Sequence, residues 1–317
     1  MNLIKKHNWM SNIIGLLSGL FWAIDGVFLL FFTKLTPTDS WELGILVTLI
    51  HDLFAILWAF IIVLIMKKNK EIKSAFTNKN IWILLLSSTI GAPFGMTMYI
   101  LAIKEIGVGQ TSSISICYVI LASVLAFIFL KQKTSKNGLM GIVIAFICVL
   151  TFGILQIETK THSFKGYIFA ILCVVGWGME AFLSSISMDR DIDPQVSIMI
   201  RHIVSAIVLG CIIAPATNSY SENVTQLLNY KNIWVIIAAS FFGAISFICY
   251  YFSINKLGIS LAVGLNISYS AFAVILEVIF FKGWQIYHWY NYLLSALILV
   301  SLLWTLVPDK IWIKTKK

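Results

Sequence analysis

Residues 104–131 read KEIGVGQTSSISICYVILASVLAFIFLK, and residues 255–282 read NKLGISLAVGLNISYSAFAVILEVIFFK. The two stretches align without a gap at an offset of 151 residues. Identical residues stand at equivalent places in both, among them Gly107 and Gly258, Tyr118 and Tyr269, Phe129 and Phe280, and Lys131 and Lys282. Self-similarity at a fixed distance indicates an internal repeat, so the fold of one half predicts the fold of the other.

The similarity between the two halves reaches further upstream. Tyr99 matches Tyr250 at the same offset. Trp22-Ala-Ile-Asp25 also resembles Trp177-Gly-Met-Glu180, because each places an acidic residue three positions after a tryptophan. Chance similarity between apolar segments does not account for so many paired landmarks, so we interpret the chain as a duplication.

The composition of the 317-residue chain indicates a membrane protein. Hydrophobic residues make up 59% of it and charged residues only 12%, whereas soluble domains contain about 25% charged residues. Since a helix of about 20 apolar residues crosses a bilayer core, we predict an all-α polytopic membrane protein with ten transmembrane helices. These helices are expected at residues 11–33, 41–66, 81–102, 108–130, 136–156, 166–187, 195–216, 231–254, 259–281 and 287–307.

The number of helices in each half determines how the two halves are oriented. Ten helices place five in residues 1–157 and five in residues 158–317, which we predict as the first and second repeats. Because five is odd, the second repeat crosses the membrane in the opposite sense and forms an inverted-topology repeat. Repeats of this kind build transporters in which a central site opens alternately to either side of the membrane.

The net charge of +9 is carried mainly by lysines that lie between and beyond the apolar segments. Because Lys and Arg gather in cytoplasmic loops, their distribution predicts that both termini lie in the cytoplasm; the resemblance described below implies that the membrane is the cytoplasmic membrane of a bacterium. We interpret the charge as a topology signal and not as a nucleic-acid-binding surface. The five cysteines form no CxxC pair, so the sequence predicts no metal site, no disulfide framework and no cofactor.

Several stretches of the chain are similar to one family of membrane transporters. They are Gly15–Trp22, His51-Asp52, Gly91–Met96, Phe129–Asn137, Trp177–Glu180, Tyr250–Asn255 and Gly264–Tyr269. On these residues the chain resembles the drug/metabolite transporter superfamily, whose duplicated unit is called EamA, and within it the bacterial choline permeases. The resemblance covers nearly the whole chain and implies a ten-helix fold that carries a small solute, with choline as the substrate. Asp25 departs from the choline permease pattern, in which we expect a small residue.

Five aromatic residues are placed for a role inside the membrane. Trp22 and Trp177 fall near the midpoints of their predicted helices, whereas membrane tryptophans usually prefer the two interfaces. Tyr118 and Tyr269 fall near the midpoints of two further helices, and Tyr250 lies toward the cytoplasmic end of another. Such side chains either pack helices together or line a substrate site, and we expect these to form an aromatic box.

A carboxylate accompanies each of the two tryptophans. Residues three apart share one helix face, so Asp25 lies beside Trp22 and Glu180 beside Trp177. A charge inside a bilayer costs about 2.5 kcal/mol or more, and each carboxylate must therefore face a cavity or a partner. Aromatic faces and a carboxylate suit a quaternary ammonium group, which has no N–H to donate. We predict a choline-like cation as the substrate, with Glu180 as its counter-charge and Asp25 as a second candidate.

Three further features inside the predicted helices have a structural or a functional explanation. His51-Asp52 lies inside the second helix and is either a proton relay, since histidine titrates near neutrality, or a buried polar pair that holds helices together. Arg201 is expected to anchor the start of its helix at the membrane surface, near the acidic loop 189–193. The segment 91–95, with Pro93 at its centre, interrupts the third helix and either forms a gate or aids packing.

The leading hypothesis is import of choline or a related quaternary amine by alternating access. The alternative is a permease of the same fold for another metabolite, such as an amino acid, or an exporter of cationic drugs. An intramembrane hydrolase would need a nucleophile beside a base. His51-Asp52 is the one tempting pair, and no G-x-S-x-G or H-E-x-x-H motif accompanies it, so we do not expect an enzyme.

Overall fold

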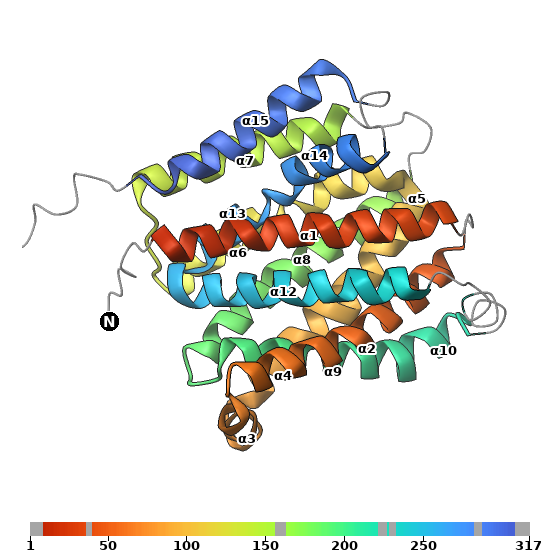
Figure 1. Ribbon diagram of the computed structural model, residues 1–317, viewed down its shortest axis with the longest axis vertical. Coiled ribbons are helices and arrows are strands. Elements are labelled where there is room, and N and C mark those ends of the chain that lie inside the picture. The colour runs from red at the N-terminus through yellow and green to blue at the C-terminus, as the bar shows by residue number, and fades with distance from the viewer. Residues whose placement is uncertain are drawn as a thin grey trace, which may run out of the picture.

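The computed structural model describes residues 9–35, 40–155, 163–220, 227, 233–281 and 287–307, and within them the regular structure is entirely helical. The first half contains α1 (Trp9–Leu35), α2 (Trp41–Ile65), α3 (Asn69–Thr77), α4 (Ile81–Thr89), η1 (Ile90–Gly95), α5 (Met96–Ser115), α6 (Tyr118–Phe129) and α7 (Lys136–Leu155). The second half contains α8 (Phe164–Met188), α9 (Pro194–Val208), η2 (Leu209–Ile213), α10 (Ala214–Ala216), α12 (Ile233–Leu257), α13 (Ile259–Asn266), α14 (Tyr269–Phe281) and α15 (Trp289–Trp304). Figure 1 shows the long helices running side by side as one bundle.

The lengths of the helices confirm an all-α polytopic membrane protein. In the described residues, nine continuous helical segments are long and apolar enough to cross a bilayer. The tenth predicted span corresponds to α15, which has 16 residues and is shorter than the expected 287–307. Large apolar side chains such as Phe127 and Trp289, 67% and 74% exposed, point outward. In a bundle of this composition, lipid is the solvent for that surface.

The two halves are interrupted at equivalent places. Gly107 has φ 77° and Gly258 has φ 90°, a backbone conformation that side chains with a Cβ rarely adopt. A second break follows in each half, and the helix resumes at Tyr118 in one and at Tyr269 in the other. The repeat recognised in the sequence is therefore a repeat of backbone geometry, and the paired glycines are required by it.

The helix neighbours follow the same duplication. In the first half α1 packs along α12 of the second, and the equivalent helix α8 packs along η1 and α5 of the first. Two further pairs join equivalent helices, α2 with α9 and α7 with α15. Figure 1 shows α1 beside α12 and α7 beside α15. The two repeats are thus interleaved, and residues from both line the interior.

Candidate functional site

The charged side chains that the described part of the chain buries gather in one network between the repeats. They are Asp25, Asp52, Glu180 and Arg201, together with His51 and His202, and none is more than 8% exposed. Removing a charge from water is costly unless a partner compensates for it, and this explains why these groups converge. When both imidazoles are neutral, three carboxylates face one guanidinium, so the network carries an excess of negative charge.

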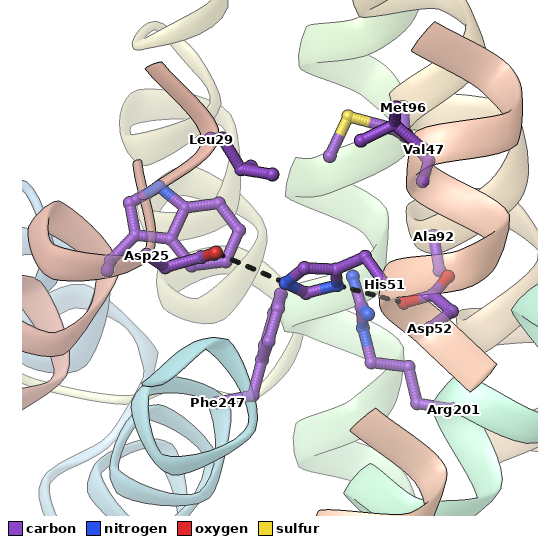
Figure 2. A pocket seen from close by; sticks show the side chains of 11 residues that line it. Asp25, Leu29, Val47, His51, Asp52, Ala92, Met96, Arg201 and Phe247 are labelled. Atoms are coloured by element: carbon purple, nitrogen blue, oxygen red, sulfur yellow. Dashed lines mark hydrogen bonds and ion pairs between the residues drawn. The ribbon is translucent and has the colours of Figure 1, made fainter. Parts of the chain in front are cut away.

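Four of these side chains form a chain of alternating acids and imidazoles. His51 Nε2 lies 3.2 Å from Asp25 Oδ1, and its Nδ1 lies 3.8 Å from Asp52 Oδ1. The same Asp52 oxygen lies 2.8 Å from His202 Nδ1. Figure 2 shows His51 standing between the two aspartates. The sequence left His51-Asp52 open between a proton relay and a buried polar pair, and the geometry extends that pair to α1 on one side and α9 on the other.

The second part of the network is centred on the ion pair of Arg201 with Glu180. Arg201 Nε donates to Glu180 Oε1 at 2.6 Å, and Tyr251 OH donates to the same oxygen at 2.9 Å. The guanidinium carbon lies 3.9 Å above the ring of Phe247. The expectation that Arg201 anchors α9 at the membrane surface is wrong, because Glu180 holds it in the interior.

The acidic residue that serves the start of α9 is a different one. Asp193 accepts from the backbone N–H groups of Gln195 and Val196 at the N-terminus of this helix. It also pairs with Lys68 at 2.5 Å. The start of α9 is therefore capped by Asp193, with Lys68 as the partner of this carboxylate.

The polar network borders a cavity of about 80 Å³. Since one water molecule takes up about 10–15 Å³ of cavity volume measured in this way, the cavity has room for roughly half a dozen non-hydrogen atoms. Its polar wall consists of Asp25, His51, Asp52 and Arg201, and its aromatic wall of Trp22 and Phe247. Figure 2 shows Leu29, Val47 and Met96 at the opposite, apolar end. A small molecule with one apolar cationic end fits this chemistry.

The aromatic wall has a defined shape. The rings of Trp22 and Phe247 meet edge to face, with centroids 5.0 Å apart and planes at 87°. Trp22 comes from α1 and Phe247 from α12, which the fold places side by side. Asp25 lies one helical turn after Trp22 and is 3% exposed. The motif predicted on α1 therefore does face the interior cavity with both of its side chains.

Trp177, the tryptophan of the second repeat's motif, belongs to a separate aromatic group. Trp177 packs against Tyr99 and Tyr118, with ring centroids 5.2 Å and 5.8 Å apart. Tyr118 OH donates to Asn266 Oδ1 at 3.5 Å, and Tyr250 and Tyr269 pack in the same buried cluster as Tyr118. None of these aromatic residues borders the cavity. The predicted box is thus divided into two groups.

Two glycines of η1 create the space that the second motif occupies. A Cβ on Gly91 would overlap the carboxylate of Glu180, and one on Gly95 would lie 2.9 Å from Cδ1 of Trp177. Ala92 of η1 and Met96, the first residue of α5, line the cavity instead. The interruption predicted around Pro93 is a π-helical turn that continues the helix, and it separates the cavity from the second aromatic group.

Replacing Gly91 by alanine is therefore expected to lower the melting temperature and to disrupt the Glu180–Arg201 pair. Overpacking of this kind costs about 1–3 kcal/mol. The measurement is a thermal melt of the detergent-solubilised protein followed by size-exclusion chromatography. Gly26→Ala is the matched control, because nothing lies within 4 Å of a Cβ at Gly26. Equal melting temperatures for the two variants would contradict the close approach of Glu180 to η1.

Sequence reasoning missed one residue of the site and the partners of two others. Phe247 was not anticipated; His202 and Arg201 were recognised as charged groups inside predicted spans that need a cavity or a partner, but His202 received no role and Arg201 was assigned to the membrane surface. The signal for the last two was present, because Arg201 and His202 are adjacent in an otherwise apolar helix. A buried carboxylate at Glu180 requires a cationic partner, and Arg201 was the one arginine inside a predicted span.

Comparison with known proteins adds three findings. Residues 9–154 and 164–307 each match the EamA-like transporter family. Protein LicB of Haemophilus influenzae (strain ATCC 51907 / DSM 11121 / KW20 / Rd) is 29% identical over 272 residues, which is 85% of this chain and 89% of that protein. A solved crystal structure of a protein with 13% sequence identity superposes with a TM-score of 0.69 over 93% of this chain and 96% of the other. At that identity the likeness shows the fold alone.

Proposed function

Because this chain belongs to the EamA-like transporter family, we propose that it imports choline, or a closely related quaternary ammonium compound, by alternating access. The observation that carries the proposal is the cavity with an excess of carboxylates on one wall and two aromatic rings on another. The resemblance of the sequence to bacterial choline permeases supports the same substrate class.

The cavity matches the requirements of a trimethylammonium group. Such a group has no N–H to donate, so ring faces and a nearby carboxylate replace its water shell. Trp22 and Phe247 form a corner of two rings, and Asp25 supplies the negative charge on the same helix face as Trp22. Glu180, by contrast, already has Arg201 and Tyr251 as partners. In this conformation we therefore assign the counter-charge to Asp25.

The second aromatic group receives the substrate in the other half of the cycle. Exchange of conformation between inverted repeats opens a central site to the opposite side of the membrane. Trp177 and Glu180 are the counterparts of Trp22 and Asp25. The substrate moves from one Trp–carboxylate motif to the other, with Tyr118, Tyr250 and Tyr269 lining its second position.

The membrane potential is sufficient to drive this import. With both termini in the cytoplasm of a bacterium, a negative interior favours entry of one positive charge by about 2.3 kcal/mol per 100 mV. The acid–imidazole chain supports proton coupling as well, since a proton on His51 lies between Asp25 and Asp52 and compensates part of their charge. A proton and a cationic substrate thus act on the same carboxylates.

Uptake of labelled choline into liposomes tests the proposal. With a negative interior, the parent protein is expected to accumulate choline, and a Trp22→Ala plus Trp177→Ala variant is expected to lose uptake. Each ring stabilises the cation by up to about 2 kcal/mol when water is excluded. Trp82→Ala is the control, because Trp82 is 58% exposed on the outside of α4. Undiminished uptake by the double variant would refute the aromatic site.

A thermal-shift screen separates the proposed substrate from other metabolites. A ligand that binds only the folded state raises the melting temperature. Stabilisation by choline and not by amino acids is the expected result. Stabilisation by an amino acid alone would assign the fold to a different permease, and transport directed outward would indicate an exporter of cationic drugs.

A further inference from the structure

The guanidinium of Arg201 has more hydrogen-bond donors than partners. An arginine carries five N–H groups and no acceptor. Within the described part of the chain, its hydrogen bond is the one from Nε to Glu180, and its two terminal amino groups have no protein acceptor. The side chain is nevertheless only 6% exposed, and it borders the cavity. Buried donors of this kind require an acceptor from outside the protein chain.

Arg201 is held in a fixed position. Glu180 fixes the Nε edge of the guanidinium, and Phe247 covers one of its faces at 3.9 Å. In Figure 2 the side chain extends from α9 toward the middle of the view, where His51 and Asp52 also lie. A donor that is already oriented loses little entropy when it binds, so it discriminates well between ligands.

The other charged groups around the cavity leave these donors available. Asp52 Oδ1 lies 2.8 Å from Nδ1 of His202. Asp25 Oδ1 lies 3.2 Å from His51. One oxygen of each aspartate thus has an imidazole as its partner, and the contacts of the guanidinium are with Glu180 and the ring of Phe247. An oxygen atom of the substrate is the acceptor that this arrangement lacks.

Resting on the proposed function, we infer that Arg201 donates a hydrogen bond to the oxygen at the polar end of the substrate. The cavity then recognises both ends of one molecule. Trp22 and Asp25 hold the methylated cationic end, and Arg201 holds the oxygen. The substrate class is a quaternary amine that carries a hydroxyl, ether or similar acceptor. A diamine is excluded, because its second ammonium group would face the guanidinium with like charge. Arg201 is thus a specificity-determining residue.

Four ligands test this role without any substitution in the protein. Choline is compared with n-propyltrimethylammonium, which has a methyl group in place of the hydroxyl. O-methylcholine is compared with n-butyltrimethylammonium, which has the same size but no oxygen. Each oxygen-bearing ligand is expected to bind roughly ten- to hundredfold tighter than its partner, the usual effect of a hydrogen bond to a charged group. The dissociation constants are measured by isothermal titration calorimetry on the full-length protein.

The O-methyl pair determines the direction of the hydrogen bond. An ether oxygen accepts but cannot donate, so O-methylcholine keeps its advantage if Arg201 is the donor. If only choline shows an advantage, its hydroxyl donates to a carboxylate, and the role of Arg201 is refuted. If all four ligands bind equally, the inference also fails while the proposed function stands. If none binds, the proposed function fails and the inference falls with it.

Arg201→Lys provides the corresponding protein variant. Lysine keeps the positive charge opposite Glu180, but it lacks the planar pair of amino groups, so the preference for choline over n-propyltrimethylammonium is expected to fall to about twofold. Binding of n-propyltrimethylammonium itself is expected to be retained, which shows that the variant is folded. A preference equal to that of the parent protein would overturn the inference.

Discussion

Replacing Asp25 by asparagine is expected to weaken choline binding by two to three orders of magnitude. The side chain keeps its shape but loses its charge beside a cation in a water-poor cavity. At an effective dielectric constant of 20, two charges 4 Å apart interact by about 4 kcal/mol, and each 1.4 kcal/mol changes affinity about tenfold. The measurement is the dissociation constant for choline, with Tm recorded to confirm that the variant is folded.

An uncharged ligand separates the electrostatic role of Asp25 from a structural one. 3,3-Dimethylbutan-1-ol has the shape of choline without its charge, and Asp25→Asn should bind it as the parent protein does. Glu277→Gln is the matched control, because Glu277 lies inside α14, accepts from Tyr287 at 2.9 Å and does not border the cavity. Equal weakening of both ligands in Asp25→Asn would show that the carboxylate only supports the fold.

Replacing Arg201 by methionine is expected to have the largest effect on stability. It leaves Glu180 buried without a cationic partner, and breaking a buried ion pair in this way costs about 3–5 kcal/mol. The melting temperature should fall by roughly 10 °C. A Glu180→Gln plus Arg201→Met variant should recover most of the loss, because no unpaired charge then remains.

The pair formed by Lys68 and Asp193 is the control for this double-mutant cycle. Lys68 is 25% exposed, and exposed pairs contribute about 1 kcal/mol or less. Lys68→Met should therefore lower the melting temperature far less than Arg201→Met. A double variant at Glu180 and Arg201 that is less stable than either single variant would contradict the strong coupling between the two side chains.

The sequence was sufficient to locate the helices because bilayer thickness and apolar length determine them. The predicted 41–66 and 166–187 correspond to α2 (Trp41–Ile65) and α8 (Phe164–Met188). The identical glycines of the repeat, Gly107 and Gly258, also have the same unusual backbone conformation. In each case one local rule, apolar length or backbone sterics, decides the outcome.

The partners inside the site could not be predicted in the same way. Asp52 pairs with a histidine 150 residues away, and Glu180 pairs with Arg201 of the next helix. The packing of the two interleaved repeats determines which polar groups come into contact. The sequence of a single helix does not specify this packing. The division of the expected aromatic box follows from the same packing, since Trp22 packs with Phe247 whereas Trp177 packs with Tyr99 and Tyr118.

The pairing of α2 with α9 places these two equivalent helices against each other, where the pseudo-symmetry axis of the molecule must pass. His51 and Asp52 on one helix and Arg201 and His202 on the other therefore lie near that axis. In the alternating-access cycle proposed above, groups near the axis of exchange would move least. The groups that are most costly to expose to lipid would thus stay in the interior throughout that cycle.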